Sequence, residues 1–229
     1  MQDQVAAPAA ARVALVAGAT GLVGREVLAA LLTDRRYKTV HVLGRRRLTL
    51  KHRKLAQHVV DFTAPLTLAD LGRVDDVFIA LGTTIKVAGS KEAFRAVDFD
   101  AVIALARAAK AAGASKLGVI SAMGASASSK VFYNRVKGEM EDALAGIGYQ
   151  TLVLARPSML AGERGALDQP SRPAERFGLL AMTLLKPLIP ENYQAILATQ
   201  VARALIVAMR STEQGTRVLL SGEMQRLHC

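Results

Sequence analysis

Tyr133 and Lys137 are the residues whose types and spacing most directly suggest chemistry. They stand four positions apart in VFYNRVKGEM, residues 131–140, and side chains at i and i+4 of a helix lie one turn apart on the same surface. A nearby ammonium favours the phenolate and so lowers the pKa of a tyrosine. Tyr133 would then serve as general acid for a carbonyl or as general base for an alcohol.

The helical wheel indicates that this spacing is more than chance. At 100° per residue, Tyr133 falls inside an apolar stripe and Lys137 at its edge. A lysine that serves only solubility would more naturally join the polar face, although a lysine that covers the stripe with its aliphatic stem remains the alternative. The stripe consists of Phe132, Val136, Met140, Ala143, Leu144 and Ile147, and the polar face of Asn134, Arg135, Glu139, Glu141 and Asp142.

A glycine-rich loop, GATGLVG, follows the first apolar run of the chain. Its spacing predicts a tight turn at Gly18, close backbone approach to a pyrophosphate at Gly21, and helix-on-strand packing at Gly24. A bare glycine triplet is weak evidence, but its position between a strand and a helix makes a dinucleotide site the favoured interpretation. The same loop contributes Thr20, Leu22 and Val23 to the expected cofactor-binding residues.

The second expected strand ends in VLGRRR, and this ending favours NADP(H) over NAD. In the NAD version of the fold, an acid at this corner binds the ribose 2′-hydroxyl. Gly44 removes that side chain, whereas Arg45 and Arg46 bring guanidinium groups that suit a 2′-phosphate. Arg47 is expected to face solvent.

Other candidates follow the remaining strands. Asp61 is expected at the adenine amino group with Phe62 beside it, although an aspartate that caps a turn is the alternative. Lys137 could hold the nicotinamide ribose hydroxyls. Ser121, in VISAMG, is the candidate that binds the substrate oxygen, with a strand-ending serine as the alternative because Ala122 leaves the register open. The cofactor-binding set is completed by Leu81, Gly82, Thr83, Thr84 and Pro157.

Strands and helices alternate along the chain with βαβ spacing. This alternation predicts one α/β domain, a Rossmann-type doubly wound parallel sheet with helices on both faces. Residues 1–11 are expected to be a flexible tail, residues 12–229 the domain, and residues 157–229 its small C-terminal cap and last strand. The expected strands are 12–18, 39–44, 55–62, 75–83, 116–124, 149–157 and 217–222, and the expected helices 24–34, 98–113, 128–148, 174–186 and 199–211.

Composition narrows the class of protein. The charge of +11 gathers partly in nine Lys and Arg between Arg35 and Lys54, but Tyr37 is the single Phe, Tyr or Trp among them, so a nucleic-acid module is disfavoured. With one cysteine, Cys229, no thiolate metal site is expected. No apolar run reaches about 18 residues, so neither an integral membrane association nor a location other than the cytoplasm is expected. A monomer or weak homodimer is expected, with a possible protein partner.

The sequence resembles an atypical short-chain dehydrogenase/reductase of the Tat-interacting oxidoreductase family, whose bacterial members are often labelled nucleoside-diphosphate-sugar epimerases. The resemblance covers roughly residues 12–222 and rests on GATGLVG, LGTTIKVAGSKEAFRAVDFD, FYNRVKGEME and SRPAE. It implies an NADPH-binding Rossmann fold with Ser121, Tyr133 and Lys137 as catalytic triad. Asp98 departs from the asparagine of extended relatives, and a carboxylate cannot donate as an amide does.

Three functions remain open. The first is an NADP(H)-dependent oxidoreductase that acts on a small carbonyl or alcohol, with residues 162–175, Met159 and Leu160 on the substrate side. The second is an NADPH-binding redox sensor or regulatory protein with little turnover. The third is a nucleotide-sugar epimerase, for which the short carboxyl-terminal region offers no obvious pyrophosphate clamp beyond Arg164, Arg172 and Arg176.

Overall fold

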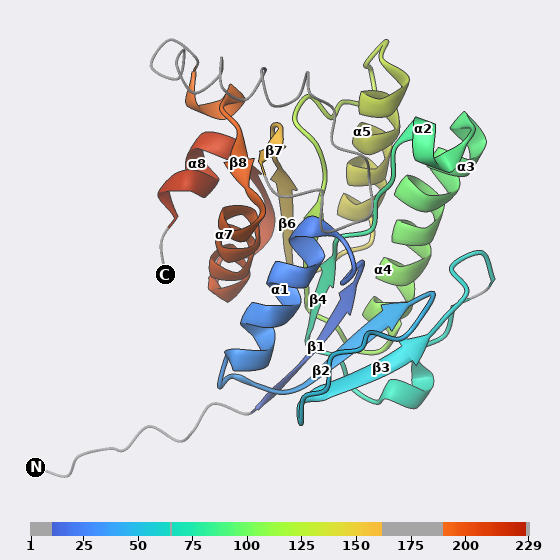
Figure 1. Cartoon of the computed structure of the whole chain (residues 1–229), viewed down its shortest axis with the longest axis vertical. Coiled ribbons are helices and arrows are strands. Elements are labelled where there is room, and N and C mark those ends of the chain that lie inside the picture. Colours follow the sequence, from blue (N-terminus) through green and yellow to red (C-terminus); the bar gives the residue numbers. More distant parts are fainter. Residues whose placement is uncertain (1–10, 65, 162–189, 228–229) are drawn as a thin grey trace, which may run out of the picture.

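A parallel sheet of seven strands runs through the described part of this computed structural model, which comprises residues 11–64, 66–161 and 190–227 (Figure 1). The strand order is β3-β2-β1-β4-β5-β6-β9, and each neighbouring pair is parallel. The chain reverses its direction across the sheet between β3 and β4, so the carboxyl ends of β1 and β4 flank the crevice where such sheets bind ligands. The strands are β1 Arg12–Ala17, β2 Tyr37–Gly44, β3 Leu55–Val59, β4 Asp76–Ile79, β5 Lys116–Ile120, β6 Thr151–Arg156 and β9 Gly215–Leu220.

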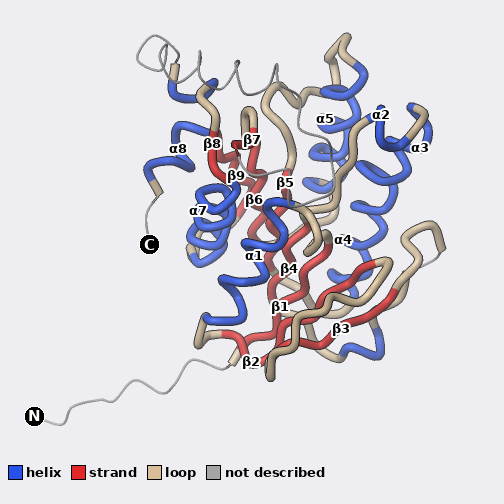
Figure 2. The backbone as a smooth tube through the Cα atoms, viewed as in Figure 1, coloured by secondary structure: helices blue, strands red, loops and turns tan. Residues whose placement is uncertain are grey.

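Helices cover both faces of the sheet (Figure 2). α1 (Leu22–Thr33) and α7 (Ala198–Arg210) pack side by side on one face, and α4 (Ala101–Ala111) and α5 (Phe132–Ala145) cover the other. The central strands β1, β4, β5 and β6 read as largely apolar runs because both of their faces are buried, whereas the edge strands β3 and β9 are partly exposed. The expected Rossmann-type doubly wound fold is confirmed.

The helix after β4 begins earlier than its apolar periodicity predicts. α3 (Lys91–Arg95) runs without a break through a π-helical turn, Ala96–Asp100, into α4. The expected helix was 98–113. Ser90 caps α3 by accepting a hydrogen bond from the Ala93 amide at 3.0 Å. The wide turn therefore places Asp98 inside a helix rather than at its start.

The described residues of the region expected to form a C-terminal cap include α7 and β9. α7 packs against α1 on a face of the sheet, and β9 is the last strand of the sheet. Near the carboxyl ends of the strands, β7 (Leu160–Ala161) pairs with β8 (Ile196–Leu197), and Ser221 of α8 (Ser221–Arg226) donates a hydrogen bond from its hydroxyl to the Ser158 hydroxyl at 2.9 Å. Shorter elements are η1 Ala69–Leu71, α2 Ile85–Ala88 and η5 Glu191–Tyr193.

Several sequence-based predictions fall outside the described residues. These are the tail up to residue 10, the loop 162–175, the helix 174–186, and Arg164, Arg172, Arg176 and Cys229. Within the described ranges, no helix is both long and apolar enough to cross a membrane.

Candidate active site

The glycine loop has the geometry that a dinucleotide site requires. Gly18 has φ +85°, and a Cβ there would lie 2.3 Å from the Ala80 carbonyl oxygen. The Gly21 amide donates to the Gly18 carbonyl at 3.0 Å, and Gly21 is the N-cap of α1 without a side-chain cap of its own. A Cβ on Gly21 would meet its nearest neighbour at 3.4 Å, an ordinary contact. The first amides of α1 are thus placed to receive a pyrophosphate.

Gly24 holds α1 against this loop, because a Cβ there would lie 2.1 Å from the Gly18 carbonyl oxygen. We expect Gly24→Ala to destabilise the protein by about 1–3 kcal/mol and to weaken dinucleotide binding, since the helix must shift away from β1. Denaturant unfolding and cofactor titration measure both effects. Gly146→Ala is the matched control, because its Cβ would make only a 3.5 Å contact in αR backbone. Equal stability of the two variants would contradict this role.

A cavity of about 340 Å³ opens where the glycine loop, the ends of β4, β5 and β6, and α5 meet. Ten of its lining residues were predicted as site residues, namely Gly21, Leu22, Val23, Leu81, Gly82, Thr83, Ser121, Tyr133, Lys137 and Pro157. Met159 and Leu160, expected on the substrate side, also line it. The lining includes Ala80, Asp98, Ile120, Ala122 and Ser158, which were not predicted as site residues.

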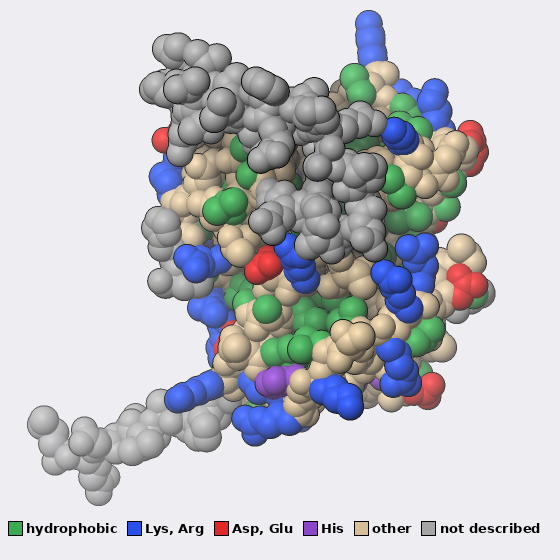
Figure 3. Space-filling view, viewed as in Figure 1, with side chains coloured by type: hydrophobic (Ala, Val, Ile, Leu, Met, Phe, Trp, Pro, Cys, Tyr) green, Lys and Arg blue, Asp and Glu red, His purple; other side chains and the backbone are tan. Residues whose placement is uncertain are grey.

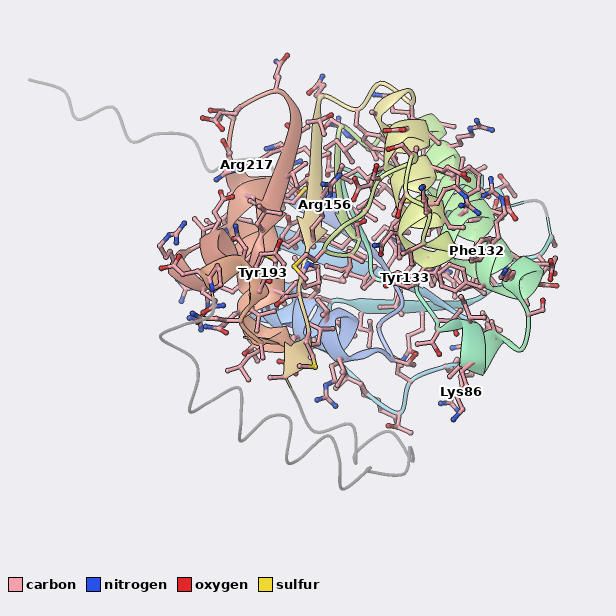
Figure 4. The ribbon with its side chains drawn as sticks, turned by 90° about the horizontal axis from the view of Figure 1, so that it is seen from above. Lys86, Phe132, Tyr133, Arg156, Tyr193 and Arg217 are labelled. Atoms are coloured by element: carbon pink, nitrogen blue, oxygen red, sulfur yellow. The ribbon has the colours of Figure 1, made fainter. Side chains whose placement is uncertain are left out.

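Tyr133 and Lys137 both reach this cavity from α5. Seen from above in Figure 4, Tyr133 lies near the middle of the molecule, while Phe132 on the same helix lies farther out. The Tyr133 ring packs on Phe94 of α3 with 5.4 Å between centroids. A Cβ on Gly138, next to Lys137, would come within 2.1 Å of the Ala127 amide nitrogen, so α5 sits directly on the loop before it.

Lys137 is paired with a residue that the sequence did not suggest as its partner. Its side chain is 4% exposed and that of Asp98 1% exposed, with Nζ and Oδ1 2.7 Å apart. The contact is an ion pair, and its angles fall short of a hydrogen bond. The other oxygen, Oδ2, accepts a hydrogen bond from the Thr83 amide at 2.9 Å.

This pairing overturns the expected lowering of the pKa of Tyr133. Burial raises the pKa of Tyr133 to about 12, and the negative charge of Asp98 adds to the rise. The positive charge of Lys137, which was expected to favour the phenolate, is compensated by the Asp98 carboxylate next to it. The phenol of Tyr133 is therefore protonated at neutral pH, and a preformed phenolate is not supported.

Ser121 lines the cavity together with Ala122. Its amide donates to the Ala155 carbonyl at 2.7 Å, which anchors the end of β5 to β6. The residue is 5% exposed, and its hydroxyl has no hydrogen-bond partner in the described part of the chain. A buried hydroxyl without a partner costs free energy unless a ligand engages it. It fits a role in binding a substrate oxygen.

The adenosine side is more open. Arg45, Arg46 and Arg47 are exposed at the end of β2, and no ion pair or hydrogen bond of their side chains occurs within the described ranges. Lysine and arginine side chains gather on the lower part of the face in Figure 3, near β2 and β3. These cations are free to meet an anion.

Two residues expected at the cofactor have other partners. Asp61 is exposed and accepts hydrogen bonds from the amide and hydroxyl of Thr63, at 2.9 and 2.7 Å. This is the turn-capping alternative, and Phe62 packs on the core instead of standing free. The Thr84 hydroxyl caps α2 by accepting from the Val87 amide at 3.2 Å. Neither Asp61 nor Thr84 lines the cavity.

The placement of Glu141 on the polar face of α5 is wrong. Glu141 is 4% exposed, and its carboxylate accepts hydrogen bonds from Arg156 Nε at 3.0 and 3.1 Å. Glu141 follows Lys137 by four residues, so it lies at the stripe's edge as well. This pair ties the end of β6, just before Pro157 and Ser158 of the cavity, to α5.

A second cavity, of about 420 Å³, lies at the opposite, amino-terminal ends of β6 and β9. It is lined by residues such as Thr151, Ser211 and Arg217 and by none of the predicted site residues. The chemistry is therefore assigned to the smaller cavity.

Comparison with known proteins agrees with this geometry. A family model described as NAD(P)H-binding matches residues 18–158. The chain is 32% identical over 212 residues to protein HTATIP2 of Rattus norvegicus, with 91% of this chain and 85% of that protein covered. It is 35% identical over 172 residues to the mitochondrial protein fmp52 of Emericella nidulans, with 72% of each covered.

Solved structures share the fold at lower identity. A short-chain dehydrogenase/reductase superfamily protein from Agrobacterium tumefaciens with bound NAD has a TM-score of 0.68 at 19% identity, over 91% of this chain and 77% of that one. MoeE5 in complex with UDP-glucose and NAD has a TM-score of 0.67 at 18% identity, over 90% of this chain and 74% of that one.

The expected cytoplasmic location is contradicted by the curated relatives. Four fungal proteins that match 66–72% of the chain, from Emericella nidulans, Aspergillus fumigatus, Eremothecium gossypii and Debaryomyces hansenii, are named as mitochondrial. The chain belongs to the NAD(P)H-binding family, because the family model matches residues 18–158 and more than two thirds of both HTATIP2 and fmp52 align with the chain. The glycine loop and the sheet order agree with this family.

Proposed function

We propose that the protein is an NADP(H)-dependent oxidoreductase that reduces a small carbonyl compound in the 340 Å³ cavity. The observation that carries the proposal is the meeting of three groups in one cavity at the end of the glycine loop. These are the partnerless Ser121 hydroxyl, the protonated phenol of Tyr133 and the buried ammonium of Lys137. A reduced nicotinamide bound there would supply the hydride.

Each residue has a role in this reaction. Ser121 donates a hydrogen bond to the carbonyl oxygen and so fixes its position. Tyr133 gives its proton to that oxygen: its own O–H bond breaks, a new O–H bond forms on the substrate, and the phenolate regains a proton from solvent. The carbonyl carbon accepts the hydride, so the carbonyl is reduced while NADPH is oxidised. Lys137 is placed to hold ribose hydroxyls of the cofactor, with its charge compensated by Asp98.

The cavity wall favours an uncharged substrate. Leu22, Ala122, Met159 and Leu160 give it an apolar side. Among the lining residues that the structure describes, the charged side chains are Asp98 and Lys137, which neutralise one another. A pyrophosphate of a sugar nucleotide would need cations, and among the described lining residues the one cation, Lys137, is already paired, which supports carbonyl reduction.

The preference for NADP(H) rests on Arg45 and Arg46. We expect Arg45→Ala combined with Arg46→Ala to weaken NADPH binding by roughly 10- to 100-fold, since a charge-assisted hydrogen bond is worth about 1.5–3 kcal/mol and solvent screening at these exposed side chains reduces the sum of the two. NADH binding should change by less than about 3-fold, because NADH lacks the 2′-phosphate. Calorimetric titration of both cofactors measures the difference.

Lys51→Ala combined with Arg53→Ala is the matched control, because it removes two exposed cations from the same basic stretch. This control should leave both affinities close to wild type. Equal losses of NADPH and NADH affinity in the Arg45 and Arg46 variant would refute the charge argument.

The proposed activity is tested by mixing the purified protein with NADPH and a panel of aliphatic aldehydes, aromatic aldehydes, diketones and quinones. Consumption of NADPH, followed by its absorbance, is expected with at least one class. NADPH that binds but is not consumed by any member of the panel would favour a cofactor-binding sensor instead.

A further inference from the structure

The structure places Asp98 in the lining of the cavity, which its position in the sequence did not predict. Asp98 lies in the π-helical turn Ala96–Asp100, and such turns are frequent at functional sites. The turn brings its side chain beneath the loop after β4, where a Cβ on Gly82 would lie 3.4 Å from Asp98 Oδ1. Asp98 thus lines the cavity although it belongs to a helix on the face of the sheet.

The two carboxylate oxygens of Asp98 have different partners. Oδ2 is fixed by the Thr83 amide at 2.9 Å. Oδ1 lies 2.7 Å from Lys137 Nζ and makes no hydrogen bond within the described residues. Asp98 therefore links the loop after β4, which faces the cofactor side of the cavity, to the lysine on α5.

The cavity around Tyr133 contains few other charges. On α5, Arg135 pairs with Glu139 at 3.9 Å and donates to the Ser129 carbonyl at 3.2 Å. On α3, Arg95 pairs with Glu139, and Lys91 lies over the Phe132 ring at 5.4 Å. The end of β5 contributes the uncharged Ser121. Among the described residues, the charges that share the cavity with Tyr133 are those of Asp98 and Lys137.

We propose that Asp98 is a positioning residue that holds the Lys137 ammonium in place, cancels its charge at Tyr133, and thereby keeps the phenol protonated as the proton donor of carbonyl reduction. The inference rests on the proposed function. A site built for alcohol oxidation needs a phenolate at working pH, and an unpaired ammonium beside Tyr133 would supply it. Asp98 compensates the charge of this ammonium, which agrees with a pKa of Tyr133 of about 12. The phenol then keeps its proton until it donates it to the substrate.

Ultraviolet titration of Tyr133 tests the proposal without any substrate. Phenolate absorbance is recorded against pH in each protein, and the curve of the matching Tyr133→Phe protein is subtracted. In the wild type we expect a midpoint near 12. In Asp98→Asn we expect the midpoint to fall by about one to two pH units, since Lys137 then acts uncompensated. Glu139→Gln, which removes a carboxylate of α5 outside the cavity, should leave the midpoint unchanged.

Two results would overturn the proposal. The first is a wild-type midpoint near neutral pH, which would mean that Lys137 acts on Tyr133 despite Asp98. The second is a folded Asp98→Asn protein with an unchanged midpoint. If Asp98→Asn does not fold, the double variant Asp98→Asn with Lys137→Met removes both charges. Its midpoint should stay within about half a unit of wild type, and a larger fall would count against compensation.

The titration separates this inference from the proposed function. A protein that reduces no carbonyl of the panel but shows the expected shift would retain the role of Asp98 and lose the oxidoreductase assignment. Where a substrate is found, Asp98→Asn should also move the alkaline limit of carbonyl reduction to lower pH, because the phenol loses its proton earlier. A merely structural role would change the rate without moving this limit.

Discussion

Replacing Tyr133 with phenylalanine is expected to lower kcat for carbonyl reduction by about 10²–10⁴-fold, which is the usual contribution of a positioned general acid. The substitution removes the hydroxyl but retains the ring that packs on Phe94. NADPH affinity and stability should therefore remain near wild type. Steady-state kinetics, cofactor titration and thermal unfolding together measure these three quantities.

Tyr193→Phe is the matched control for this substitution. Tyr193 is 58% exposed in η5 and does not line the cavity (Figure 4). Its hydroxyl should be dispensable for turnover. An undiminished kcat in Tyr133→Phe, or an equal fall in Tyr193→Phe, would contradict the role assigned to Tyr133.

Lys137→Met is expected to lower the free energy of unfolding by about 3–5 kcal/mol, because it leaves the buried Asp98 carboxylate without its counter-charge. Methionine fills a similar volume, so the loss reports the charge rather than a cavity. Adding Asp98→Asn should recover most of that stability, since the uncompensated charge is then gone. Urea unfolding of the two single variants and the double variant gives the coupling energy directly.

Lys86→Met provides the comparison for a lysine in solvent. Lys86 is exposed on α2 at the rim of the molecule (Figure 4), and its loss should change stability by less than about 0.5 kcal/mol. If Lys137→Met were equally harmless, the ion pair with Asp98 would not contribute to the fold as the structure indicates.

The centre of the sheet was predictable because β1, β4, β5 and β6 are buried on both faces and read as largely apolar runs. The glycine loop was predictable as well, since close backbone contacts leave no room for a side chain at Gly18 or Gly24. The start of α3 was missed because apolar periodicity is weak there. Its capping serine, Ser90, followed by Glu92 in the first turn, was a usable signal.

The electrostatics of the site could not be predicted in the same way. Lys137 and Asp98 are far apart in the chain, and nothing in the local sequence of either one identifies the other as its partner. The helical wheel assigned Glu141 to the solvent-facing side of α5, because charged side chains are usually solvated. In the structure Glu141 is buried, and Arg156 from β6 compensates its charge. Long-range pairing therefore decides both the burial of these charges and the pKa of Tyr133.

Transfer of deuterium from NADPH labelled at C4 of its nicotinamide tests the central claim most directly. The purified protein is incubated with each of the two C4 stereoisomers (4R and 4S) of the labelled cofactor and the carbonyl panel, and the products are analysed by mass spectrometry. The account predicts a deuterated alcohol from one isomer with the wild-type protein, and little or none in the same time with Tyr133→Phe. Bound NADPH with no deuterated product from any carbonyl, or equal labelling by Tyr133→Phe, would contradict it.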